Sequence, residues 1–357
     1  MGMAIRQGAK SINPVPKQAT FQSPGSKCSK RNSPLSWIIF VDLLRLRIYL
    51  TFGAIRAKIA SMSAHFLLLV LAATNIFAQI QVVLLGTGTP NADPARSGPS
   101  TAIIVNGASY IVDLGPGVVR RAAATKLPAL APANLKLAFL THLHSDHTAG
   151  LSDFYLTPAV LDRHGPLKLY GPKGTKRLAH HIQQAYKADA DNRVQGLEHG
   201  DPKSYRIDAT EFKAGKIYED SNVTVTAIPV QHGDWRESYG FLFETKDGKR
   251  IVVSGDTVAS DNIINACNGC DILVHEVYSE AGWQKRPPQW QRYHKAAHTS
   301  GPDLGRLAAK AKPKQLVLTH LLLWTATPQQ LLDEIKSNYS GPLQLGNDLD
   351  VFTIPSK

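Results

Sequence analysis

"FLTHLHSDHTAGL", residues 139–151, places three histidines and one aspartate within six consecutive positions. Alternate residues of an extended segment point to the same side, so His142, His144 and Asp146 share one face, and a turn would bring His147 round to them. Imidazole and carboxylate groups are the ligands suited to zinc or a similar first-row metal. The stretch therefore predicts a metal site at the end of a strand.

Three more apolar runs end in a metal-binding side chain. They are "VQH", "VSGD" and "VLTH", which end at His232, Asp256 and His320. Strand ends at one edge of a sheet are where a rigid scaffold presents chemistry to solvent. One zinc ion takes about four ligands, so seven ligands with one shared carboxylate make two sites. We therefore expect a two-metal centre at which all four segments meet.

From residue 80 onward the chain alternates between strand and helix patterns. "TAIIV" and "YIVDLG" are typical of a hairpin joined across Asn106 and Gly107, because Asn-Gly favours a tight turn. Apolar runs predict further strands at 79–86, 135–142, 167–172, 223–232, 239–245, 250–257, 271–277 and 315–320. Helical periods are found at 118–127, 176–188 and 300–311. The alternation predicts an α/β fold.

The formal net charge of +12 is concentrated at the amino terminus. Residues 1–61 hold ten of the 40 basic residues but one of the 28 acidic residues, which leaves 30 basic and 27 acidic residues beyond them. The main body is therefore close to neutral. It has no general signature of a nucleic-acid-binding surface.

The first 61 residues do not have the pattern of a folded domain. The segment 13–34 is rich in Pro, Ser and Lys, and it has no sustained apolar period. The apolar stretch 37–52 is interrupted by Asp42, Arg45 and Arg47, whereas a membrane-spanning helix needs about 20 mostly apolar residues. We expect residues 1–61 to be a disordered or untranslated basic leader.

Residues 62–78 have the pattern of a signal peptide. "MSAHFLLLVLAATNIFAQ" offers a start methionine, an apolar run from Phe66 to Ala73, and Ala78 in a position that suits cleavage. The alternative is a buried helix at the start of the domain. A used signal predicts an exported protein, periplasmic or secreted, with 79–357 as its working domain and no stable membrane partner after cleavage. An unused signal predicts a cytoplasmic protein.

Two of the three cysteines lie in the predicted domain. Cys28 falls in the leader, and "CNGC" contains Cys267 and Cys270. The pair could form a disulfide, a redox pair or half of a zinc site. A structural zinc site needs about four ligands, and the sequence has no second cysteine pair. We favour two small residues at a helix end that are open to oxidation.

The pattern His-x-His-x-Asp-His at 142–147 resembles the signature of the metallo-β-lactamase fold superfamily, and the similarity runs from about Gln81 to Thr353. The resemblance implies a four-layer αββα sandwich, with two mixed β-sheets face to face, helices outside and the metals at one sheet edge. It also implies two Zn²⁺ ions, with manganese or iron as alternatives. By resemblance, the first metal takes His142, His144 and His232, the second takes Asp146, His147 and His320, and Asp256 bridges them.

Within this superfamily the chain is most similar to the ribonuclease Z type. "GTGTP" at 86–90 and "DLGPG" at 113–117 fit that family. Glu276 in "HEVY" stands where the family has His-Glu-Ala-Thr, although Val277 departs from the pattern. "HTSGPDLGRLAAKA" matches the family's His-Ser-Thr helix start, which gives His298 the place of its proton donor, oriented by the glutamate.

The resemblance implies a metal-dependent hydrolase that cleaves phosphodiester bonds, like an endoribonuclease Z. Metal-bound hydroxide would attack in line, with Asp146 orienting it. His298, held by Glu276, would protonate the departing alkoxide. These three residues are the predicted catalytic groups.

The substrate and the reaction class have alternatives. Short-form ribonuclease Z enzymes grip tRNA with a Gly- and Pro-rich arm, which segment 183–205 does not resemble. With the export pattern, this favours a smaller phosphodiester or sulfate ester over RNA. Hydrolysis of acyl, lactam or lactone bonds and a metal-binding accessory role are the other candidate functions. A homodimer is compatible with the sequence.

Other polar and aromatic residues have ordinary interpretations. His180 and His181 are typical of a solvated helix face, and His275 of a core position on a strand. Asp113 is expected to brace the ligand loop rather than bind metal. The remaining cluster forms either a lid over the metals or part of the core: it consists of Trp283, Trp290, Tyr293 and His294.

Overall fold

The computed structural model describes residues 80–355. The predictions for the leader at 1–61 and for the signal peptide at 62–78 lie outside these residues. Within the described range, no helix is long and apolar enough to cross a membrane.

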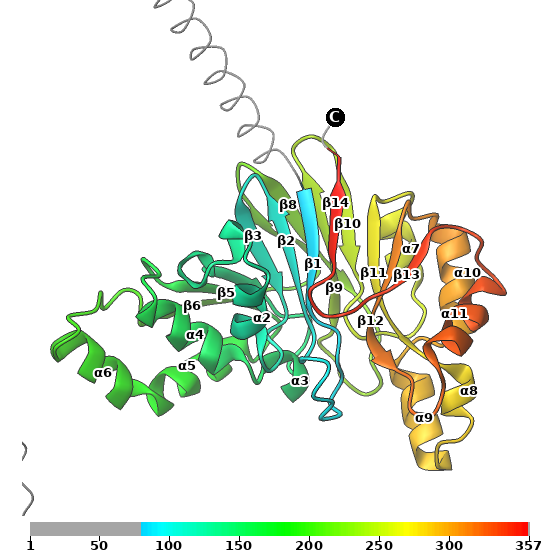
Figure 1. Ribbon diagram of the computed structural model, residues 1–357, viewed down its shortest axis with the longest axis horizontal. Coiled ribbons are helices and arrows are strands. Elements are labelled where there is room, and N and C mark those ends of the chain that lie inside the picture. Colours follow the sequence, from blue (N-terminus) through cyan, green and yellow to red (C-terminus); the bar gives the residue numbers. More distant parts are fainter. Residues whose placement is uncertain (1–79, 356–357) are drawn as a thin grey trace, which may run out of the picture. The chain divides into compact units, whose positions relative to one another are not determined.

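Two seven-stranded mixed sheets form the framework (Figure 1). The first sheet has the order β14-β1-β2-β3-β4-β5-β6 and the second has the order β13-β12-β11-β10-β9-β8-β7. Each contains three antiparallel and three parallel strand pairs. The strands are β1 (Ile80–Gly86), β2 (Ser100–Val105), β3 (Ala108–Val112), β4 (Leu137–Phe139), β5 (Leu167–Gly171), β6 (Ile207–Glu211), β7 (Gly215–Glu219), β8 (Val223–Pro229), β9 (Tyr239–Thr245), β10 (Arg250–Val253), β11 (Ile272–Tyr278), β12 (Leu316–Leu322), β13 (Leu343–Leu345) and β14 (Val351–Ile354).

Helices cover the outer face of each sheet (Figure 1). Apolar residues of α2, α4 and α5 pack on the first sheet, and those of α7, α10 and α11 pack on the second. The helices are α2 (Val118–Ala124), α3 (Ser145–Thr148), α4 (Leu151–Val160), α5 (Thr175–Ala185), α6 (Lys187–Gln195), α7 (Asp261–Cys267), α8 (Glu280–Trp283), α9 (Pro288–Ala297), α10 (Gly301–Ala311) and α11 (Pro328–Lys336).

Three separate apolar cores follow from this layering. On β1, Val82 and Leu84 face the core between the sheets, while Val83 and Leu85 face the helices, because successive strand residues point to opposite faces. A sheet that is buried on both faces has strands with continuous apolar runs. The predicted four-layer αββα sandwich with two mixed sheets is therefore confirmed.

Two local predictions are confirmed as well. Val105 of β2 pairs with Ala108 of β3 in a hairpin whose turn residues, Asn106 and Gly107, both have positive φ. Cys267 ends α7 and is bonded to Cys270. The cysteine pair is therefore a disulfide rather than half of a metal site.

The strand that carries His320 differs from the expectation. His320 was expected at the end of its strand, but β12 continues to Leu322. The register between β11 and β12 shifts at this point, because Glu276 pairs with Thr319 and Val277 pairs with Leu321. His320 is the extra residue, with φ 45°. A β-bulge re-aims a side chain, and here it allows a residue inside the strand to face the metal ligands.

A buried arginine connects α4 to the first sheet. The Arg163 guanidinium is 1% exposed and donates to the carbonyl oxygens of Phe154 and Tyr155 in α4 and of Ser204 before β6. The Ser204 hydroxyl donates in return to the Arg163 carbonyl. The Arg163 side chain thus supplies hydrogen-bond donors to backbone carbonyl groups of α4 and of the loop before β6.

We expect Arg163→Ala to lower the free energy of unfolding by about 3–5 kcal/mol, because it removes a buried charged group together with its hydrogen bonds to three carbonyl oxygens. Urea unfolding followed by circular dichroism measures the change. The matched control is Arg120→Ala, whose side chain is 79% exposed and which should change the stability by about 0.5 kcal/mol or less. Equal losses for the two variants would contradict the assignment.

Candidate metal centre

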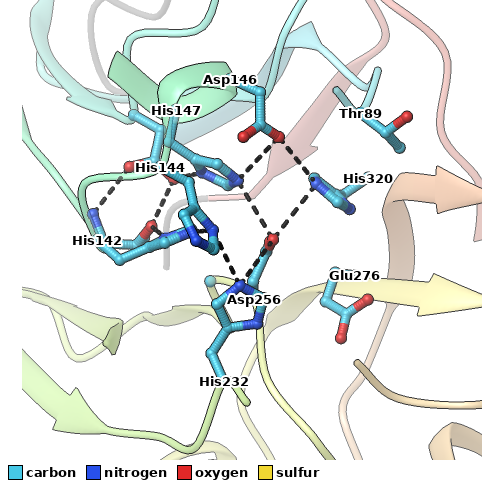
Figure 2. Close-up of polar contacts among 12 residues, drawn as sticks. Thr89, His142, His144, Asp146, His147, His232, Asp256, Glu276 and His320 are labelled. Atoms are coloured by element: carbon cyan, nitrogen blue, oxygen red, sulfur yellow. Dashed lines mark hydrogen bonds and ion pairs between the residues drawn. The ribbon is translucent and has the colours of Figure 1, made fainter. Parts of the chain in front are cut away.

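Four segments bring the seven predicted ligands together at one edge of the two sheets. His142 and His144 follow β4, and Asp146 and His147 lie in α3. The other three ligands come from the second sheet: His232 follows β8, Asp256 follows β10 and His320 lies in β12. Six of the seven side chains are buried, and His144 is half-buried. Figure 2 shows their polar groups turned toward one another.

Three histidines form the first group. The Nδ1 atom of His144 lies 2.9 Å from Nε2 of His142 and 3.1 Å from Nε2 of His232. Nδ1 of His232 donates to the carbonyl oxygen of Ala297 at 2.7 Å, so in the neutral ring Nε2 carries a lone pair. Nδ1 of His142 contacts the Thr141 hydroxyl at 3.0 Å, so Nε2 of His142 also carries a lone pair in the neutral ring. The lone pairs of His142 Nε2 and His232 Nε2 thus both face Nδ1 of His144. A cation bound among these three nitrogens would stabilise the arrangement.

Two carboxylates and two histidines form the second group. Nε2 of His320 lies 3.3 Å from Oδ2 of Asp146 and 3.4 Å from Oδ2 of Asp256. Nε2 of His147 lies 3.5 and 3.4 Å from the same two oxygens. Ligands that surround a tetrahedral zinc ion at about 2.0–2.1 Å are about 3.3–3.4 Å apart. The spacing of this group fits a metal ion.

Asp256 lies within reach of both groups (Figure 2). Its Oδ2 atom is 3.4 Å from Nε2 of His147 and 3.9 Å from Nε2 of His232. One carboxylate oxygen therefore faces ligands of both groups, as a bridging ligand must.

The electrostatics of the cluster favour a bound cation. Burial, followed by repulsion from His147, lowers the pKa of His142 well below its usual value. Burial also opposes a charge on His147, but Asp256, Asp113 and Asp146 outweigh it and raise the pKa of this imidazole. Burial would raise the pKa of Asp256, yet His320 and His147 hold it well below its usual range. The second group therefore keeps its carboxylates ionised and attracts positive charge.

Asp113 holds the ligand loop in place, as expected from the sequence. Its carboxylate accepts hydrogen bonds from the backbone N–H and the hydroxyl of Thr141, both at 2.8 Å. Oδ2 also accepts from Nδ1 of His147 at 2.8 Å. That bond leaves Nε2 of His147, which is buried and has no hydrogen-bond partner within residues 80–355, pointing into the second group.

Glu276 and His298 lie together beside the metal ligands. Oε1 of Glu276 accepts from the Thr299 N–H at 2.8 Å, and Oε2 lies 3.3 Å from Nδ1 of His298. Both of these facing atoms are buried, and neither has a hydrogen-bond partner among the described residues. Burial raises the pKa of Glu276 and lowers that of His298 to about 4. Both shifts favour the uncharged forms of the two facing groups.

His298 also contacts a candidate metal ligand directly. Its ring stacks on that of His320, with centroids 5.5 Å apart and an interplanar angle of 18°. His275, by contrast, is completely buried and its Nδ1 contacts the Glu276 carbonyl at 2.7 Å. The core position expected for His275 is thus observed.

A cavity of about 500 Å³ opens beside the ligands. Trp290, Tyr293 and His294 line it, whereas Trp283 does not. The structure thus places the first three of these residues on the cavity, and the lid over the metals stays a prediction. The cavity is also lined by residues that sequence reasoning missed, namely Arg286, Trp324 and Asn91. No periodicity or motif marks these three, although Trp324 lies four residues after His320. Pro90, the last residue of "GTGTP", lines the cavity as well.

Comparison with known proteins agrees with this geometry. A family model described as "Beta-lactamase superfamily domain" matches residues 109–321. The chain is 33% identical over 276 residues to a protein named "Ribonuclease Z" from Mycobacterium bovis (strain BCG / Pasteur 1173P2), covering 76% of this chain and 96% of that one. It is 33% identical to the Mycobacterium marinum protein of the same name, covering 76% and 97%.

Solved structures show the same fold. Human tRNase Z, short form, aligns with a TM-score of 0.58 at 22% identity and covers 77% of this chain and 99% of that one. The metallo-β-lactamase fold protein YhfI from Bacillus subtilis has a TM-score of 0.58 at 18% identity, with coverage of 77% and 99%. The chain therefore belongs to the metallo-β-lactamase fold superfamily and, within it, to the ribonuclease Z-like branch of metal-dependent hydrolases.

Proposed function

We propose that this protein is a two-zinc phosphodiesterase. The first ion would be held by His142, His144 and His232, the second by Asp146, His147 and His320, with Asp256 between them. Manganese or iron would suit the same nitrogen and oxygen ligands. The observation that carries the proposal is the arrangement of two ligand groups around one carboxylate oxygen, next to the Glu276–His298 contact.

The metal pair would supply charge stabilisation for the phosphoryl group and a hydroxide nucleophile at neutral pH. The chain's own part begins with Asp146, whose carboxylate faces the second ligand group and can accept a hydrogen bond from the attacking water. This bond orients the water for an in-line approach.

The leaving group receives its proton from His298. The Nε2–H of this ring would donate to the departing alkoxide while Nδ1 takes a proton from the Glu276 carboxyl group, 3.3 Å away. The imidazole is thus neutral before and after the step, and the net proton comes from Glu276. Such a relay matches a buried pair in which the pKa of the acid is raised and that of the imidazole is lowered.

The substrate class we propose is a nucleotide phosphodiester or a short single-stranded RNA. The names of the relatives support RNA, but segment 183–205 does not support a grip on folded tRNA. It forms the end of α5, helix α6 and a turn, and two of its three Lys and Arg side chains have acidic partners. Lys187 pairs with Asp191, and Arg193 pairs with Asp189 and Glu198. The relatives do not favour hydrolysis of acyl, lactam, lactone or sulfate-ester bonds, or an accessory role.

We also propose that the protein is exported after cleavage at the signal peptide. Support comes from the apolar run in 62–78 and from the Cys267–Cys270 disulfide, a bond that persists in oxidising compartments.

We expect Asp113→Asn to lower the affinity for zinc about 10- to 100-fold, because the amide no longer stabilises the tautomer of His147 and the ligand loop. Competition with a chromogenic chelator measures this affinity. Asp208→Asn, at a side chain that is 46% exposed and paired with Arg206, is the matched control and should leave it unchanged. Unchanged zinc affinity in a folded Asp113→Asn protein would argue against this role.

We expect His298→Ala to retain both metals and to lose activity in a way that depends on the leaving group. Cleavage of a dialkyl phosphodiester should fall about 10²- to 10⁴-fold, and cleavage of bis(p-nitrophenyl) phosphate much less, because nitrophenolate departs without a proton. Steady-state rates with metal analysis of the same sample test this. The control is His181→Ala on the exposed face of α5. Equal losses with the two substrates would exclude His298 as the proton donor.

We expect the exported form of the protein to begin near Gln79. Expression of the full chain in a bacterial host with an active secretory pathway, followed by N-terminal sequencing of the extracytoplasmic protein, tests this. A mature protein that begins at Met1 or nearby would refute the export proposal without affecting the proposed chemistry.

A further inference from the structure

One wall of the cavity is aromatic and is not explained by metal binding. It consists of Trp290, Tyr293 and His294 on α9, with Arg286 before this helix and Trp324 after β12. We call these five residues the aromatic wall. They line the same cavity as the metal-binding candidates His144, Asp146 and His320.

The two outer rings of the wall are exposed. Trp290 is 45% and Tyr293 is 43% exposed, and among residues 80–355 the only other tyrosine or tryptophan with similar exposure is Tyr186. Trp290 contacts Tyr293 edge to face at 5.9 Å, and Tyr293 contacts His298 at 6.2 Å. The rings therefore lead from solvent to the proposed proton donor. Exposed aromatic rings that border a catalytic cavity are suited to stack on a planar ligand.

Arg286 adds a positive charge to the wall. Its guanidinium carbon lies 5.7 Å from the ring centre of Trp290 and 5.3 Å from that of Trp324. Its side chain makes no ion pair with any described residue, and its Nε atom is buried without a hydrogen-bond partner. Other arginines of the described chain, such as Arg120 and Arg306, do pair with carboxylates. A partly buried guanidinium without an acid is suited to bind an anion.

The wall is held in position by hydrogen bonds that do not use its exposed surfaces. Nε1 of Trp283 donates to the carbonyl oxygen of Gln291 at 2.9 Å. The Gln291 amide in turn donates to the carbonyl oxygens of Gln284 and Arg286, at 3.0 and 2.9 Å. Nδ1 of His294 contacts the Trp290 carbonyl at 2.7 Å. The loop and helix that carry the wall are thus pre-organised for binding.

Resting on the proposed phosphodiesterase function, we propose that the aromatic wall is a subsite for one nucleotide of the substrate. Trp290 and Tyr293 stack on its base, and Arg286 binds a second phosphate of the same nucleotide, next to the one that is cleaved. Stacking on aromatic side chains and guanidinium contacts is a general way to bind single-stranded nucleic acid without reading its sequence. A cavity of about 500 Å³ falls in the range of ligand sites and suits a single nucleotide rather than a folded RNA.

The test uses three phosphomonoester probes and the zinc-loaded full chain. Isothermal titration calorimetry compares ribose 5-phosphate, adenosine 5′-monophosphate, and adenosine 3′,5′-bisphosphate. Ribose 5-phosphate and adenosine 5′-monophosphate differ in the base, so their comparison measures its effect. Adenosine 5′-monophosphate and adenosine 3′,5′-bisphosphate differ in the additional phosphate. None of the three is a phosphodiester, so binding is measured without turnover.

We expect the base to increase the affinity of the wild-type protein about 10- to 100-fold. In Trp290→Ala this increase should fall to about threefold or less, and Trp290→Phe should retain most of it. The second phosphate should add about tenfold in the wild-type protein and nothing in Arg286→Ala. Tyr186→Ala and Arg120→Ala are the matched controls, since both positions are exposed outside the cavity, and both should behave as wild type.

Equal binding of ribose 5-phosphate and adenosine 5′-monophosphate to the wild-type protein would overturn the subsite. So would a base effect that survives in Trp290→Ala. The result is separable from the proposed function: base-dependent binding without cleavage of any phosphodiester would keep the subsite and reject the phosphodiesterase. Cleavage of phosphodiesters with no effect of the base on binding would keep the phosphodiesterase and reject the subsite.

Discussion

The hydrogen bonds of Asp113 are the constraint on which the metal centre depends. Asp113 directly follows β3 and has a left-handed conformation with φ 61°. Its carboxylate joins the end of this strand to the ligand loop through Thr141 and His147. The backbone strengthens the same connection, because Leu114 N–H donates to the His147 carbonyl. Without this carboxylate, Thr141 would lose two hydrogen bonds and His147 would lose the acceptor that fixes its tautomer. The candidate ligands of the two groups would then be held less firmly in position relative to one another.

The second sheet presents His320 through an irregularity in the pairing of β11 and β12. The bulge at His320 turns this ring toward Asp146 and Asp256 while leaving Glu276, on the neighbouring strand, in contact with His298. A regular strand would place His320 on one of two alternating faces, both of which are buried in apolar cores in this sandwich. The positive φ of His320 is a strained conformation, and this conformation is what turns the ring toward the two carboxylates. The candidate ligand His320 and the contact between Glu276 and His298 thus depend on the same pair of strands.

Much of the fold could be predicted because its signals are local. The Asn106-Gly107 turn, the apolar strands and the His-x-His-x-Asp-His spacing each depend on residues that are adjacent in the chain. The aromatic wall could be predicted only in part, because the sequence left open whether Trp290, Tyr293 and His294 cover the site or fill the core. Arg286, Trp290 and Trp324 come from three segments, and whether an aromatic residue lies in a core or on a cavity depends on what packs against it. Trp283 and Trp290 are seven residues apart in one sequence cluster, yet only the second lines the site.

The sequence by itself determined the chemistry available to this protein: which segments carry imidazole or carboxylate groups, and how many such groups there are. Residue type and short-range spacing are properties of the covalent chain, and they persist in any conformation. Only the tertiary structure decided how those groups meet. It brought one oxygen of Asp256 between two ligand groups and left Arg286 without an acidic partner among residues 80–355. The physical reason is that distances between segments far apart in sequence are set by sheet register and helix packing, which no single segment encodes.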